Sequence, residues 1–105
     1  MEQAVILTFD FSREHRGTRP DLETLQDLGD ELGKQVKRAR VGEFDGDEFG
    51  EDDFQMFFYG PSADQLFDVV KAGLKQFKCS VPVTAVKRYG APGATEHREE
   101  LRLGA

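Results

Sequence analysis

The fold is decided by residues 54–65, which read FQMFFYGPSADQ. In the first letters, side chains alternate at the two-residue period of a strand, so that Phe54, Met56 and Phe58 share one face and Phe57 lies on the other. The Gly-Pro pair then ends the strand. The letters SADQ match a capping box, in which a serine hydroxyl accepts from the backbone N–H three residues later. This stretch therefore predicts a strand that leads directly into a helix.

Two further strands are expected before this one. Residues 4–11 read AVILTFDF, a run of β-branched and aromatic residues that is typical of a central strand. In residues 41–49, Phe44 and Phe49 are five positions apart, so in a regular strand their side chains would point to opposite faces. They can face the same way only if one extra residue is inserted between them. Gly46 is the natural position for that bulge. The acidic residues 51–53 can then form the turn of a hairpin with the strand at 54–60.

Two helices and a last strand complete the pattern. Pro20 suits the first turn of a helix, because its missing N–H has no partner there. The apolar stripe of this first helix consists of Leu22, Leu25, Leu28, Leu32 and Val36. The stripe of the second helix, which starts at Ser62, consists of Leu66, Phe67, Val70, Leu74 and Phe77. Gly73 within it indicates close packing on the sheet. Residues 81–89 supply the last strand, and Pro82 at its start indicates an edge position.

The resulting order, βαββαβ, places the chain in the α+β class. Two split βαβ halves of this kind make a ferredoxin-like two-layer sandwich. We expect a four-stranded antiparallel sheet with both helices on one face, in a single domain over residues 1–91. Residues 92–105 have few apolar anchors and are expected to form a charged, flexible tail or a short, loosely docked helix. The other face of the sheet would expose aromatic side chains, and such patches usually mark an interface.

Composition excludes several classes of function. The chain has 105 residues, with 20 acidic and 14 basic side chains and a net charge of −6. A general binder of nucleic acid or of anionic membranes needs a cationic face, so neither partner is expected. The first residues show neither the basic region of a signal peptide nor a long apolar run. Cys79 is the only cysteine and cannot form an internal disulfide, which favours the reducing cytoplasm.

Part of the sequence resembles a group of small uncharacterised bacterial proteins with the same βαββαβ order. The resemblance rests on residues 42–50, GEFDGDEFG, on residues 57–67, FFYGPSADQLF, and on the tripeptide RYG at 88–90. These motifs belong mainly to the hairpin and to the start of the second helix. The resemblance therefore implies the fold and implies no established activity, and no functional residue is carried over from it.

The acidic hairpin is the first candidate site. Its candidate partner-binding residues, together with two neighbouring aromatic side chains, are Glu43, Asp45, Asp47, Glu48, Phe57 and Tyr59. An EF-hand calcium loop starting at Asp45 does not fit, because Phe49 and Met56 would occupy ligand positions five and twelve. No metal site is predicted. A solvated turn that discourages pairing at the sheet edge explains the same residues, and docking of a basic partner is the alternative.

The loop at residues 13–19 is the second candidate. Arg13, His15, Arg16 and Arg19 precede the first helix, where cationic side chains and backbone N–H groups could hold a phosphate or carboxylate. A flexible polar connector is the plainer interpretation. The loop has no nucleotide-binding glycine pattern, and no cofactor is expected. A third candidate is a small polar site on the open sheet face, formed if Asp10, Tyr59 and Tyr89 converge there.

No nucleophile, base and orienting residue can be assembled into a catalytic set, so the sequence favours a protein that is not an enzyme. We predict a protein-interaction module that meets a basic partner through the acidic hairpin. An immunity-type protein that neutralises a toxin is one form of this hypothesis, and a homodimer through the open sheet face is another. The alternative is a small-molecule-binding or catalytic domain with a pocket between the open face and the 13–19 loop.

Overall fold

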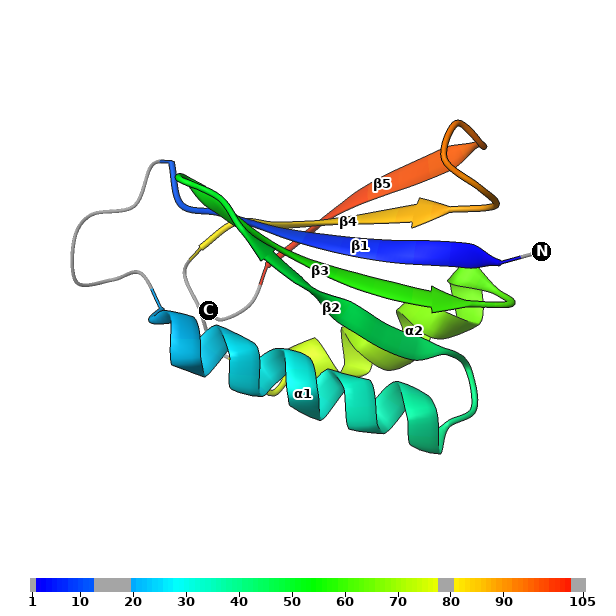
Figure 1. Ribbon diagram of the computed structural model, residues 1–105, viewed down its shortest axis with the longest axis horizontal. Coiled ribbons are helices and arrows are strands. Elements are labelled where there is room, and N and C mark those ends of the chain that lie inside the picture. Colours follow the sequence, from blue (N-terminus) through cyan, green and yellow to red (C-terminus); the bar gives the residue numbers. More distant parts are fainter. Residues whose placement is uncertain (1, 13–19, 78–80, 103–105) are drawn as a thin grey trace.

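Five antiparallel strands and two helices make up the part of the protein that the structure describes. The computed structural model describes residues 2–12, 20–77 and 81–102. The elements are β1 (Gln3–Asp10), α1 (Leu22–Arg38), β2 (Glu43–Phe49), β3 (Asp53–Gly60), α2 (Ala63–Leu74), β4 (Val83–Arg88) and β5 (Glu96–Leu101). The strand order is β2-β3-β1-β4-β5. Figure 1 shows both helices on the same side of the sheet, so the predicted α+β class and the arrangement of the helices are confirmed.

The sheet has five strands, and the prediction of four was wrong. The fifth strand, β5, comes from the segment that was expected to be a flexible tail, and it pairs with β4 from Val83↔Leu101 to Arg88↔Glu96. It was missed because its residues, EHREEL, have no apolar alternation. Its position also corrects the assignment of Pro82 to an edge strand, since β4 has β1 on one side and β5 on the other.

The core lies between the sheet and the helices, and β1 runs through its centre as predicted. Strand β1 pairs with both β3 and β4. Its side chains Val5, Leu7 and Phe9 are fully buried, as are those of Phe54, Met56 and Phe58 on β3. Helix α1 lies over β2, and α2 packs against β1, β3 and β4. The helices therefore cover one face of the sheet at its central strands.

The predicted bulge in β2 is confirmed. The register between β2 and β3 shifts between Phe44 and Gly46, so that Asp45 is the extra residue, and Gly46 has a φ of +119°. The inserted residue brings Phe44 and Phe49 to the same face, opposite Phe58 and Phe54. Phe44 packs on Phe58 with ring centroids 5.1 Å apart.

Both helix starts are close to their predicted positions. The Asp21 carboxylate accepts from the backbone N–H of Thr24 (2.8 Å) at the start of α1, and the Ser62 hydroxyl accepts from that of Gln65 (3.3 Å) at the start of α2. In the predicted stripe of α1, Leu22 is the exception, because it precedes the first packed turn and is 42% exposed. Neither helix in the described part of the chain is long and apolar enough to cross a membrane.

Gly73 permits a close helix–helix contact, which corrects the expectation that it packs on the sheet. A Cβ atom at this position would lie 2.5 Å from both the Leu32 Cδ2 and the Gln35 Oε1 of α1. The glycine therefore lets α2 approach α1 directly.

Candidate functional site

The sheet face that points away from the helices, called the open face below, has an apolar row at its centre. In the antiparallel register, Ile6 of β1 lies between Phe57 of β3 and Val86 of β4. Ile6 and Phe57 are half-buried and Val86 is 8% exposed. Figure 1 shows that neither helix crosses this side of the sheet. Apolar surface therefore reaches the solvent at Ile6 and Phe57 on two adjacent strands, with the buried Val86 beside them.

A polar row runs beside the apolar one. Thr8 of β1 is paired with Gln55 of β3 and with Thr84 of β4. The Gln55 side-chain amide donates to the Thr8 hydroxyl over 3.2 Å. All three side chains are half-buried. The amide and hydroxyl thus join β1 to β3 across the open face.

Carboxylates line both outer strands of the open face. On β2, Glu43 lies opposite Tyr59, Glu48 lies opposite Gln55, and Asp45 protrudes at the bulge. On β5, Glu96 lies opposite Arg88 and Glu100 opposite Thr84. These five carboxylate residues are all exposed. The acidic side chains therefore flank the apolar row on two sides.

Two arginines and two further carboxylates belong to the same face. Arg88 on β4 donates through Nε to the Gly90 carbonyl (2.9 Å), and Arg98 on β5 lies opposite Val86. Asp53 of β3 is paired with Asp10 of β1, on the face that also carries Thr8 and Gln55. Together with the five residues on the outer strands, the open face carries seven carboxylates against two guanidinium groups on the five strands. It is acidic, like the chain as a whole.

Two shallow hollows lie at opposite ends of the open face. The larger, about 760 Å³, lies beside Tyr59 and Arg88 and is bordered by Glu2, Glu43 and Asp45. The smaller, about 560 Å³, is lined by the following residues: Thr8, Asp10, Glu51, Asp52, Asp53, Gln55, Thr84 and Arg98. The larger hollow combines an aromatic ring with side chains of both charges.

The structure brings most of the predicted partner-binding residues to one face. Glu43, Asp45, Glu48, Phe57 and Tyr59 lie on or at the rim of the open face. Asp47 does not join them, because it lies opposite Met56, whose side chain is buried beneath the helices. The predicted anion-binding residues Arg13, His15, Arg16 and Arg19 lie outside the described residues.

The acidic residues do not form a metal centre in the described part of the chain, where no group of three or more His, Cys, Asp or Glu side chains has a suitable arrangement. Strand alternation accounts for this. Asp45 and Asp47 turn to different faces, while Glu43 and Glu48 lie opposite residues four positions apart on β3.

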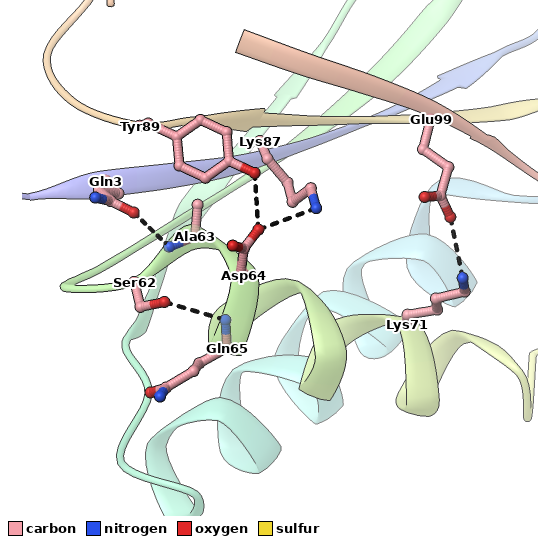
Figure 2. Close-up of polar contacts among 9 residues, drawn as sticks. All are labelled: Gln3, Ser62, Ala63, Asp64, Gln65, Lys71, Lys87, Tyr89 and Glu99. Atoms are coloured by element: carbon pink, nitrogen blue, oxygen red, sulfur yellow. Dashed lines mark hydrogen bonds and ion pairs between the residues drawn. The ribbon is translucent and has the colours of Figure 1, made fainter. Parts of the chain in front are cut away.

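Tyr89 belongs to a cluster on the helix side of the sheet, which corrects the expectation that it converges with Asp10 and Tyr59 on the open face. Figure 2 shows its hydroxyl donating to the Asp64 carboxylate of α2 (2.7 Å), to which the Lys87 ammonium also donates (3.0 Å). The two hydrogen bonds, chiefly that from Tyr89, lower the pKa of Asp64. The bond to Asp64 raises the pKa of Tyr89 and of Lys87.

A second polar contact ties β5 to α2. The Lys71 ammonium donates to the Glu99 carboxylate (3.0 Å), as Figure 2 shows. Lys71 and Lys87 also lie over the Phe67 ring, 5.6 and 5.2 Å from its centroid. These contacts orient the β4–β5 hairpin on the helix layer. They were not predicted from the sequence, although the shared parity of Lys87 and Tyr89 was a signal that both face the same layer.

Comparison with known protein families, with curated proteins and with solved structures finds no match to this chain. The resemblance to uncharacterised bacterial proteins stays a prediction. The function is therefore argued from the geometry of the open face.

Proposed function

We propose that the protein is a non-enzymatic interaction module that binds a protein partner on the open face of its sheet. The observation that carries the proposal is the contrast between the two faces of the same strands. Phe58 is fully buried, whereas its neighbour Phe57 and the adjacent Ile6 are half-buried with no helix over them. An apolar row in the middle of a face, bordered by polar residues, is typical of a binding surface.

The outer edges of the sheet are less suited to a partner. Strand addition requires an accessible edge with regular hydrogen-bonding groups, and charged side chains and bulges oppose it. Strand β2 has a bulge at Asp45 and four acidic residues, and β5 has five consecutive charged or ionisable residues from Glu96 to Glu100. These edges favour a partner that docks on the face.

The finer fold assignment and the cellular role belong to the same proposal. The first four strands lie in the order β2-β3-β1-β4, which supports a ferredoxin-like unit extended by β5. An acidic domain of this kind suits an immunity-type protein that neutralises a basic toxin. The single Cys79 supports a place in the reducing cytoplasm.

A photo-crosslinking side chain tests the docking face. The phenyl ketone analogue of phenylalanine, placed at position 57, is to be activated by light in the cell that encodes the protein. We expect a discrete crosslinked adduct. The matched control carries the same analogue at Gln26, an exposed position on α1. Absence of an adduct from position 57, or equal adducts from both positions, would contradict docking on the open face.

The larger hollow favours a second function, the binding of a small molecule. It lies between Tyr59 and Arg88, so an aromatic ring and a cation face the same space of about 760 Å³. A metabolite that binds there would raise the melting temperature, because a ligand stabilises the state to which it binds. The increase should be lost in Tyr59→Ala and kept in Gln26→Ala. A metabolite screen without any such increase would remove this candidate.

A further inference from the structure

We propose that the partner presents a basic amphipathic helix, which lies along β1 on the open face. This inference rests on the proposed docking function and names the chemistry of the partner. The apolar row of Phe57, Ile6 and Val86 runs across β1, beneath the middle of such a helix, so it would receive apolar side chains from the central turns of that helix. Lysine or arginine side chains on the two flanks of the helix would reach the carboxylates of β2 and β5.

The spacing of the outer strands fits one helix. Adjacent strands are about 4.8 Å apart, so β2 and β5, which are four intervals apart, are separated by about 19 Å. A helix with its side chains is about 10–12 Å wide, which leaves roughly 4 Å on each side. Long basic side chains cover that distance while their stems lie on apolar surface. Strands of six to eight residues span about 20–25 Å, the length of a helix of roughly 15 residues.

The distribution of charge selects the sign of the partner. Glu43, Asp45 and Glu48 stand on one side of the apolar row, and Glu96 and Glu100 stand on the other. Arg88 and Arg98 reduce this charge without reversing it. A cationic helix would therefore be attracted from both flanks.

The same charges disfavour the other occupants of the face. A second copy of this chain would bring its own acidic open face, and like charges stacked across an interface repel. Nucleic acid and anionic lipid would be repelled for the same reason. Partners that add a strand would meet the charged edges β2 and β5. A basic helix is the occupant that matches both the apolar row and its acidic flanks.

Designed peptides test the inference directly. The probe is a labelled peptide of about 15 residues, with leucines along one helical stripe and lysines on both flanks. One control peptide has the same composition in an order without a stripe, and another has glutamates in place of the lysines. We expect fluorescence anisotropy to show saturable binding of the first peptide only. Equal binding of the reordered peptide, or of the glutamate peptide, would overturn the inference.

Variants of the protein locate the binding. Phe57→Ser should weaken binding at least tenfold, and the double variant Asp45→Asn with Glu48→Gln should weaken it several-fold and reduce its dependence on salt. The matched control neutralises two exposed carboxylates of α1, as Asp27→Asn with Asp30→Asn, and should bind like the parent. Circular dichroism and thermal melts verify that each variant is folded. Equal weakening in the control would show unspecific attraction and overturn the inference.

Two further outcomes separate this inference from the proposed function. If position 57 yields a discrete adduct in the cell while the basic peptide does not bind, the face docks a partner of different chemistry, and only the helix inference is overturned. An adduct with twice the mass of the chain, accompanied by a dimer in sedimentation that Phe57→Ser abolishes, would show that a second copy occupies the face. That result would also overturn the inference.

Discussion

Phe57 and Phe58 are neighbours on β3 that face opposite sides of the sheet, so they should respond very differently to truncation. Phe58 is fully buried and packs on Phe44, with ring centroids 5.1 Å apart. Phe58→Ala should therefore lower the free energy of unfolding by about 3–5 kcal/mol, which includes the cost of the cavity. Phe57 is half-buried on the open face. Phe57→Ala should cost about 1 kcal/mol, roughly half the value of burying a phenylalanine, because water fills the space.

Urea denaturation followed by circular dichroism measures both changes. The difference of about 2–4 kcal/mol corresponds to roughly 10–20 °C in the melting temperature of a domain this size. The slope of the unfolding free energy against urea should stay constant in both variants, so that the difference reflects stability alone. Equal costs for the two variants would refute the division of the sheet into a covered and an open face, and with it the docking proposal.

Three further predictions concern the framework that holds the site. Gly42→Ala should destabilise the domain by more than about 2 kcal/mol in urea denaturation, because its Cβ would overlap the Tyr59 carbonyl oxygen; a stability like that of the parent would contradict this close approach. Gly46→Ala should cost about 1 kcal/mol or more, because Gly46 has a φ of +119° and nothing lies within 4 Å of an added Cβ, so backbone strain alone would be measured. Asp64 has a lowered folded pKa, so its contribution is present above the unfolded pKa of about 3.9 and is lost as the pH falls through the folded value. Asp64→Asn should therefore flatten the acid limb of a plot of unfolding free energy against pH, and an unchanged limb would show that the bonds to Tyr89 and Lys87 add no stability.

The sequence predicted those helices and strands whose signals lie within their own residues. Ser62 and the strand before it could be assigned because a cap and a two-residue alternation are properties of neighbouring residues. The bulge in β2 could be predicted because Phe44 and Phe49 are an odd number of residues apart and share a face only if one extra residue lies between them. Strand β5 could not be found in this way, because its pairing depends on the backbone groups of β4 and only Leu101 reaches the core.

The candidate site was predictable only where it depends on strand parity. The places of Phe57 and Tyr59 on the open face follow from the alternation in β3. Asp47 lies on the other face from Glu43, because the extra residue at Asp45 changes which face the following side chains of β2 point to. The cluster of Tyr89 with Asp64 required knowledge that α2 lies beneath the end of β4. The flanking carboxylates of β5 could not be assigned to the open face, because β5 itself was not predicted as a strand.

The central position of β1 has a consequence for how the domain assembles. Strand β1 is the first element of the sheet in the sequence, but both of its neighbours, β3 and β4, come much later. The β2–β3 and β4–β5 pairs are local hairpins that can form early, whereas β1 must close two long loops before it joins them. Folding should therefore be governed by the insertion of β1 between two preformed hairpins. During synthesis, the apolar residues of β1 stay without their second neighbour until β4 has emerged, and an unpaired strand of this kind can pair wrongly in that interval.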